Sequence, residues 1–158
     1  KLHGEWLCKM FVQYDDFSLI VVRPSFVYGF VPRQDDLISK WLQSVLADDV
    51  LHIAGDGEIR RNYVYVEDVA NAVQKMLETG IDGTKLMINP DDISLNDVIT
   101  AISDVVSPKC VRHEYVDMHV SGYSTNGLRG ARVDHSFRTI QQGITNMKCI
   151  YETHLRNI

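Results

Sequence analysis

The stretch GDGEIRRNYVYVEDVANAV, residues 55–73, decides how the chain is organised. It opens with two glycines one residue apart and continues through two adjacent arginines, an alternating aromatic and aliphatic run and a helix-like segment. A glycine-rich loop that holds a dinucleotide must follow a strand and open a helix. Here the flanking residues 50–54 and 61–66 both have the character of strands. Gly55-Asp56-Gly57 is therefore predicted to be the turn of a β-hairpin, not a phosphate loop.

The two arginines of this stretch are separated by strand alternation. Arg61, Tyr63 and Tyr65 share one face of the predicted strand, and Arg60 faces the opposite way. We therefore expect at most one arginine to point into a pocket. A guanidinium there would suit a bidentate contact with an anion, whereas the alternative is a surface ion pair.

Outward from this stretch, helical and strand-like segments alternate, which indicates α/β architecture. Residues 17–23 form an apolar, β-branched run typical of a strand buried on both faces in a parallel sheet. Ser94 with Asp97, and Thr139 with Gln142, are spaced as helix-capping boxes. Helices are predicted over 2–14, 35–49, 68–79, 94–106 and 139–155, and further strands over 85–89 and 110–116.

Composition limits the class of protein. The chain has 158 residues, enough for one compact domain, and a net charge of −5, which argues against nucleic-acid binding. No apolar run approaches the roughly 18–20 residues needed to cross a bilayer. Three widely spaced cysteines are typical of reduced thiols in a cytoplasmic protein, and six scattered histidines lack the spacing of a metal site. The chain begins at Lys1, inside a predicted helix, so we expect a piece of a longer protein.

Four stretches, in order, resemble the extended short-chain dehydrogenases/reductases, specifically the NAD(P)-dependent nucleotide-sugar epimerases and dehydratases. KLHGEWLCKMF (1–11) resembles the helix that begins at the lysine of the family's Tyr-x-x-x-Lys motif. RPSFVYG (23–29) resembles its Arg-Pro-x-Asn-Val-Tyr-Gly segment. The opening stretch resembles its Gly-Asp-Gly-x-x-x-Arg-Asp-Phe-Val-Tyr-Val block, and KLMINPDDISLNDV (85–98) its Tyr-Asn-Ile-Gly strand with the following helix.

This resemblance implies the C-terminal part of a Rossmann-like parallel sheet together with a small α/β substrate-binding domain. Residues 1–33 and 66–93 would belong to the dinucleotide-binding domain, and residues 34–65 and 94–158 to the nucleotide-sugar-binding domain. The family's Gly-x-x-Gly-x-x-Gly fingerprint, its motif tyrosine and its catalytic Ser/Thr have no counterpart here. The N-terminal half of the family fold is therefore expected to be absent.

The resemblance also implies roles for particular residues. Lys1 would be the catalytic lysine, which binds the nicotinamide ribose and lowers the pKa of the motif tyrosine. Pro24, Ser25, Phe26 and Val27 would lie against the nicotinamide ring. Arg61 would bind the diphosphate of the substrate. Phe26 stands where the family often has an asparagine that contacts that diphosphate, so the local contact must differ.

Other residues are interpreted as structural or remain candidates for substrate binding. Asn62 replaces the family's usual aspartate, and Glu67 with Asp68 is interpreted as a structural helix start. Candidates for a second phosphate contact are Arg112, Arg129 and Arg132.

The functional hypothesis is a fragment of a nucleotide-sugar epimerase, dehydratase or reductase that uses NAD or NADP and is inactive alone. The complete protein would be a homodimer, with a nucleotide-diphosphate sugar as ligand and no metal, nucleic-acid or membrane partner. The alternatives are a non-catalytic module of the same fold and one half of a split enzyme.

Overall fold

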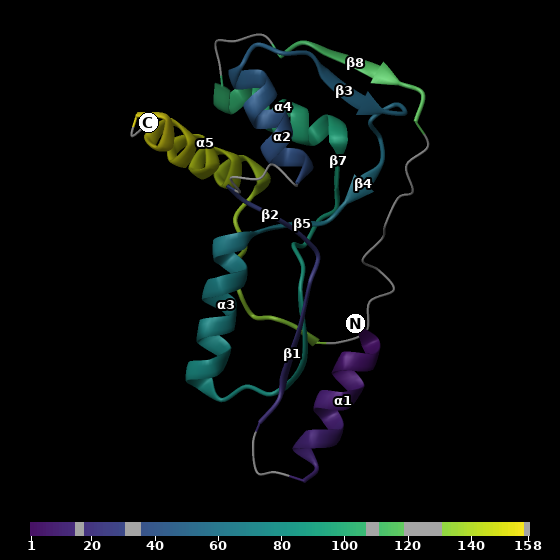
Figure 1. Ribbon diagram of the computed structural model, residues 1–158, viewed down its shortest axis with the longest axis vertical. Helices are drawn as coiled ribbons and strands as arrows, with labels where there is room; N and C mark the ends of the chain where they lie inside the picture. The colour runs from purple at the N-terminus through teal and green to yellow at the C-terminus, as the bar shows by residue number, and fades with distance from the viewer. Residues whose placement is uncertain (15–17, 31–35, 107–110, 119–130, 157–158) are drawn as a thin grey trace.

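A computed structural model describes residues 1–14, 18–30, 36–106, 111–118 and 131–156 of the chain. It has a mixed α/β architecture that extends along one axis (Figure 1). The helices are α1 (Leu2–Val12), α2 (Leu37–Leu46), α3 (Val66–Thr79), α4 (Leu95–Val106) and α5 (Ile140–Arg156). The strands are β1 (Ile20–Pro24), β2 (Phe26–Tyr28), β3 (Leu51–Ala54), β4 (Arg60–Arg61), β5 (Tyr63–Tyr65), β6 (Gly83–Met87), β7 (Ile93–Ser94), β8 (His113–Val116) and β9 (Ala131–Arg132).

Parallel pairing dominates the strands. β1, β6 and β9 form a parallel sheet, and β2 with β5 and β3 with β8 form parallel pairs. β4 and β7 pair antiparallel. The predicted parallel strand after residue 17 is thus confirmed, but its predicted burial on both faces is wrong, because Val21 alone is buried within β1.

The predicted hairpin around Gly55-Asp56-Gly57 is also wrong. β3 and β4 are joined by this turn, yet β3 pairs with β8 and β4 pairs with β7. Both glycines adopt positive φ, and the Gly57 carbonyl accepts a hydrogen bond from the Asn96 backbone N–H (3.2 Å). This contact with the start of α4 turns the chain away from β3, so tertiary packing overrides the local hairpin signal. The segment opens no helix, in keeping with its interpretation as a turn.

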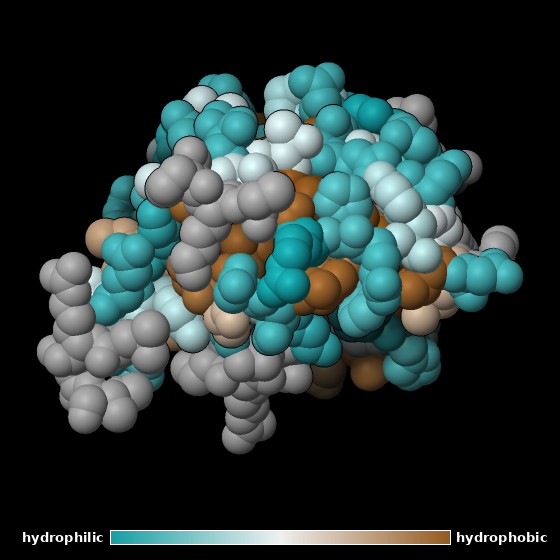
Figure 2. Space-filling model, turned by 90° about the horizontal axis from the view of Figure 1, so that it is seen from above, coloured by the Kyte–Doolittle hydropathy of each residue, from teal (hydrophilic) through white to brown (hydrophobic). Residues whose placement is uncertain are grey.

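Two apolar clusters hold the molecule together. The larger one joins α2, α4 and α5 with β3 and β5 and includes Trp41, Ile53, Ile102 and Ile144. Figure 2, which looks down on this end, shows mainly hydrophilic residues with hydrophobic ones visible between them. The smaller cluster lies between α3 and the β1–β6 sheet and is built around Ala72, Met76 and Met87. The predicted capping boxes are confirmed at the starts of α4 and α5.

Helix α1 buries none of its residues. Four of its large apolar side chains are exposed, whereas Met10 is half-buried. An ion pair attaches its first turns to the sheet: Arg23 Nε and Nη2 lie 2.9 and 2.5 Å from the Glu5 carboxylate oxygens. The Arg23 contact lowers the pKa of Glu5. Because Arg23 precedes Pro24, this pair holds the beginning of α1 at the carboxyl end of β1. The exposed residues are Leu2, Trp6, Leu7 and Phe11.

Asp68 links the beginnings of α3 and α5. Its buried carboxylate accepts hydrogen bonds from the Arg138 backbone N–H and from Arg138 Nη1, both at 2.7 Å. The guanidinium of Arg138 also lies 3.2 Å from Glu67 and 5.0 Å from the centre of the Tyr65 ring. This supports the predicted structural role of Asp68, although it acts by bridging two helices and not by capping one.

No helix in the described ranges is long and apolar enough to cross a membrane.

Gly143 on α5 lies directly against the Tyr28 side chain, and a Cβ at this position would overlap the tyrosine ring and hydroxyl. We expect Gly143→Ala to lower the free energy of unfolding by about 1–3 kcal/mol, because the added methyl group would overpack the core. Gly4→Ala is the matched control. It meets no atom within 4 Å on exposed α1, and helix propensity there favours alanine by up to about 1 kcal/mol. Urea unfolding of both variants checks this, and equal shifts would contradict it.

Candidate functional site

The turn from β1 to β2 is fixed by backbone contacts. The Ser25 N–H donates to the Met87 carbonyl (3.1 Å), while the Ser25 hydroxyl (2.7 Å) and the Phe26 N–H (3.1 Å) both donate to the Asn62 carbonyl. Ligands of open α/β sheets bind at such carboxyl ends of strands. Because both polar groups of Ser25 are engaged in these hydrogen bonds, its role in the structure is to position the turn. Phe26 and Val27 remain 40% and 39% exposed at this strand end.

The Asn62 amide is fully buried and fixes the loop that follows β6. Its Nδ2 faces three oxygens: the Asn89 carbonyl (3.0 Å), the Asp91 carbonyl (3.3 Å) and Asp92 Oδ1 (3.0 Å). Its Oδ1 accepts the Asn89 backbone N–H at 2.9 Å, which sets the orientation of the amide. The Asn89 N–H needs an acceptor here, and the surrounding oxygens need a donor. An asparagine side chain provides both, so it suits this position, where the family usually has aspartate.

Arg61, Phe26 and Tyr63 come together from β4, β2 and β5. The Arg61 guanidinium lies over the Phe26 ring, 5.1 Å from its centre, and the Phe26 and Tyr63 rings are 6.0 Å apart. Tyr63 and Tyr65 both contact Tyr28, so the predicted common face of Arg61, Tyr63 and Tyr65 is confirmed. We refer to Phe26, Arg61 and Tyr63 as the arginine cluster.

Two polar atoms of the arginine cluster are buried and have no acceptor among the described residues: Arg61 Nε and the Tyr63 hydroxyl. Burial raises the pKa of the Tyr63 hydroxyl, and the charge of the neighbouring Arg61, together with a hydrogen bond between the two side chains, opposes that rise. No ion pair of Arg61 occurs within the part of the chain that the structure describes. A buried guanidinium nitrogen and a buried hydroxyl, both free to donate, form an arrangement suited to an anion.

Arg60 lies on the other side of the strand, as predicted. Its Nη2 donates to the Asp92 carbonyl (2.6 Å), and its Nη1 lies 3.7 Å from Asp97. Arg60 is thus engaged in an exposed structural contact.

The remaining predicted residues lie apart from the arginine cluster. Lys1 is exposed at the start of α1, one helical turn before Glu5. Arg112 donates to the Asp48 carbonyl beside β3, and Arg132 lies on β9 next to Leu86 of β6. Arg129 falls outside the described residues. No group of three or more His, Cys, Asp or Glu side chains in the described ranges is placed to hold a metal ion.

A pocket of about 300 Å³ adjoins Tyr63. One wall is the loop that Asn62 fixes, and the other is the segment that leads into α5. Sequence reasoning assigned Tyr63 to the correct face but no role to its hydroxyl, and it missed Arg138, for which the sequence carries no signal. The lining residues are Tyr63, Asn89, Pro90, Asp91, Ile93, Phe137, Thr139 and Ile140.

Comparison with known proteins gives consistent matches. Residues 1–89 match the model of the NAD dependent epimerase/dehydratase family. A dTDP-4-dehydro-6-deoxy-D-allose reductase from Streptomyces bikiniensis is 31% identical over 84 residues, which cover 51% of this chain and 26% of the reductase. A UDP-glucuronate 4-epimerase from Thermodesulfobacterium geofontis is 28% identical over 103 residues, or 65% of this chain and 32% of that protein.

Solved structures share the fold. A UDP-glucose 4-epimerase from Thermotoga maritima, solved with UDP-glucose, superposes with a TM-score of 0.72 at 20% identity, covering 98% of this chain and 52% of that one. A UDP-glucuronic acid 4-epimerase from Bacillus cereus, in complex with UDP-glucuronic acid and NAD, gives 0.71 at 22% identity, with 98% and 51% covered. The matched segments thus span 26–32% of these two curated relatives and 51–52% of these two solved chains.

Asn62→Asp should destabilise the protein in a pH-dependent way. A carboxylate would face the oxygens that now accept from Asn62, so its pKa in the folded state should rise above the unfolded value of about 3.9. The cost, about 3 kcal/mol near neutral pH, should then shrink as pH falls toward about 4. Urea unfolding at both pH values checks this, with Asn71→Asp on the exposed face of α3 as control. A pH-independent loss would contradict the proposed contacts.

Proposed function

The chain belongs to the NAD dependent epimerase/dehydratase family, and from that membership we propose that it provides the nucleotide-sugar side of an active site. In this proposal the arginine cluster binds the diphosphate of a nucleotide sugar. The observation that carries it is the pair of buried donors, Arg61 Nε and the Tyr63 hydroxyl, which have no acceptor among the described residues. A buried donor without an acceptor is costly, so a bound anion would recover that free energy.

The substitution of Phe26 for the family's asparagine fits this site. Phe26 cannot donate a hydrogen bond, but its ring lies under the Arg61 guanidinium and restricts the orientation of that plane. A guanidinium of fixed orientation donates two parallel hydrogen bonds to a diphosphate more readily than a mobile one. We therefore propose that Phe26 acts on the substrate through Arg61.

We propose that NAD or NADP lies against the turn formed by Pro24, Ser25, Phe26 and Val27. Phe26 and Val27 offer exposed apolar surface where parallel strands end, which fits a flat nicotinamide ring. Ser25 is already engaged with Asn62, so its part is to hold the turn. The cofactor, when bound, accepts and returns a hydride from the sugar.

Lys1 is proposed as the positive member of a Tyr-Lys acid/base pair. Its charge would stabilise the deprotonated form of a neighbouring tyrosine and so lower the pKa of that tyrosine. The Glu5–Arg23 ion pair favours this role, because it holds the first turns of α1 at the carboxyl end of β1. In this proposal the tyrosine of the pair comes from the remainder of the family fold.

The chain is accordingly proposed to be inactive alone and to need the remainder of the family fold, either in a longer polypeptide or as a separate chain. The exposed apolar residues of α1 and the sparse burial of β1 favour such completion, and we propose a cytoplasmic homodimer for the complete protein. A non-catalytic module of the same fold is the alternative. The complete protein would then bind a nucleotide sugar without turning it over.

Arginine substitutions test the diphosphate site. We expect UDP to bind the chain, and Arg61→Ala to weaken binding about ten- to a hundredfold, because a hydrogen-bonded charge pair is lost. Arg61→Lys should recover only part of the affinity, since an ammonium cannot donate as a planar fork. Arg60→Ala is the matched control and should leave the dissociation constant nearly unchanged. Calorimetric titration checks this, and equal losses in Arg60→Ala and Arg61→Ala would contradict the assignment.

Cofactor binding tests the proposed incompleteness. The chain supplies one side of the dinucleotide site and lacks the glycine-rich fingerprint, so we expect no micromolar NADH binding in a fluorescence titration. Micromolar affinity for NADH would refute the proposal that the remainder of the fold is required.

A further inference from the structure

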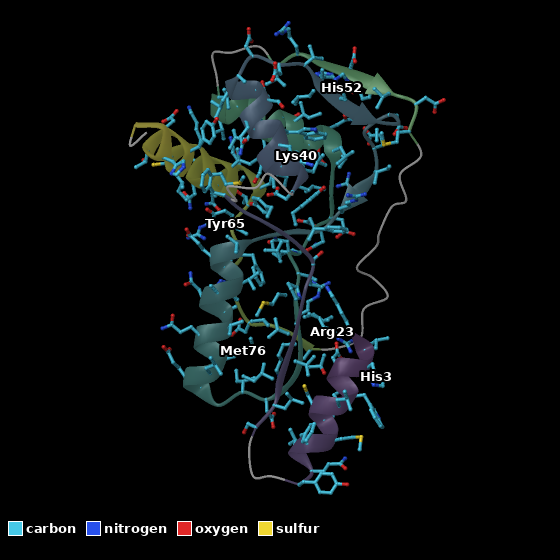
Figure 3. All side chains as sticks on the ribbon, viewed as in Figure 1. His3, Arg23, Lys40, His52, Tyr65 and Met76 are labelled. Carbon is cyan, nitrogen blue, oxygen red and sulfur yellow. The ribbon has the colours of Figure 1, made fainter. Side chains whose placement is uncertain are left out.

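We propose a second small-molecule site, in the pocket between the loop after β6 and the start of α5, for a compound that carries an ammonium group on an apolar body. The pocket has a volume of about 300 Å³ and lies where the two apolar clusters meet, because Ile93 packs against the larger one and Phe137 against the smaller one. Figure 3 shows β5, which borders the pocket, at Tyr65, between the part of the molecule that contains Lys40 and the part that contains Met76. Ligand pockets occur preferentially at such junctions.

The pocket and the arginine cluster lie at opposite edges of the segment that carries Tyr63. The Asn62 carbonyl accepts the Phe26 N–H and so points to β2. The next carbonyl, that of Tyr63, accepts a hydrogen bond from the Asn89 side-chain amide. Successive carbonyls of an extended segment point to opposite edges, so the loop wall of the pocket lies away from β2, whereas the Arg61 guanidinium lies over the Phe26 ring. The second site therefore does not depend on the proposed diphosphate site.

Both walls of the pocket are fixed by buried polar contacts. On one side, the buried Asn62 amide donates to the carbonyls of Asn89 and Asp91. On the other side, Arg138 donates to the buried Asp68 carboxylate through its backbone N–H and its guanidinium, both at 2.7 Å. The pocket is thus formed in the absence of a ligand, and binding costs little free energy of rearrangement.

Asp91 is the one charged residue in the described lining of the pocket. The two other polar side chains there have structural partners: Asn89 donates to the Tyr63 carbonyl, and the Thr139 hydroxyl accepts the Gln142 N–H. The carboxylate of Asp91, in contrast, has no hydrogen bond or ion pair within the described ranges. It is therefore available to a ligand that enters the pocket.

The basic residues next to the walls leave this charge uncompensated. Arg60 lies 3.7 Å from Asp97, and Arg138 is bound to Asp68. A mainly apolar pocket with one unpaired carboxylate is complementary to a cation with an apolar body. The ammonium group would donate to Asp91 while the apolar body is removed from water, whereas an anion would be repelled and a neutral compound would gain no charged contact.

Phenethylamine is a suitable probe, followed by NMR of the Ile93 and Ile140 methyl groups in the full chain. We expect saturable shifts, with an affinity that Asp91→Asn weakens about fivefold or more, because a charged hydrogen bond to an exposed carboxylate is lost. Asp82→Asn is the matched control and should leave the affinity unchanged, since Asp82 is exposed just before β6, at the opposite end of that strand from the pocket. Urea unfolding checks that each variant folds.

Two analogues separate the contributions of charge and apolar contact. Binding of phenethyl alcohol that is weaker by about fivefold or more, and of ethylamine by about tenfold or more, would support the site. Equal affinity for phenethyl alcohol would overturn the role of Asp91, and equal affinity for ethylamine would overturn the apolar contact. Absence of saturable shifts, or undiminished affinity in Asp91→Asn, would refute the site. A loss in Arg61→Ala as large as that in Asp91→Asn would place the ligand at the arginine cluster instead.

Discussion

The buried amide of Asn62 is the interaction on which the site depends. Its side chain fixes the loop after β6, and its backbone carbonyl receives the Ser25 hydroxyl and the Phe26 N–H. One residue therefore sets the positions of the turn from β1 to β2 and of the loop that borders the neighbouring pocket. Arg61 and Tyr63 flank Asn62 in sequence, so the same constraint determines where their side chains emerge.

Aromatic packing carries this constraint across the molecule. Tyr63, Tyr28 and Tyr65 contact one another in series, and Arg138 lies over Tyr65 while binding Asp68. The series connects the arginine cluster with the beginnings of α3 and α5. Tyr28 in turn lies against Gly143, where the absence of a side chain on α5 makes room for it. The arginine cluster thus packs against the larger apolar cluster, to which Tyr28, Tyr63 and Tyr65 belong.

Features that are local in sequence were predicted correctly. The capping boxes at Ser94 and Thr139 involve residues three positions apart, and strand alternation separated Arg60 from Arg61 because the side-chain period of a strand is two. The hairpin at Gly55 failed for the opposite reason. Whether a hairpin forms depends on whether β3 and β4 pair more favourably with each other or with other strands. Their actual partners, β8 and β7, are distant in sequence, so a local pattern cannot reveal them.

The site itself could be predicted only in part. Arg61 and Phe26 were identified through the family motifs, but the contact between them joins strands that are distant in sequence. The same holds for Arg138, whose partner Asp68 lies 70 positions away. Neither residue pair has a periodic or compositional pattern, so the contacts emerge only when the fold brings the segments together.

The exposed position of α1 has a consequence for what sequence variation can reveal. An isolated helix of this length is marginal in water, and α1 buries nothing that would add to the stability of the chain. Substitutions at Trp6 or Phe11 are therefore nearly silent in the folding of this polypeptide. Selection that keeps those side chains apolar must therefore act through surfaces outside this polypeptide that they contact. Sequence variation in α1 then reports on association, whereas variation in the core reports on folding.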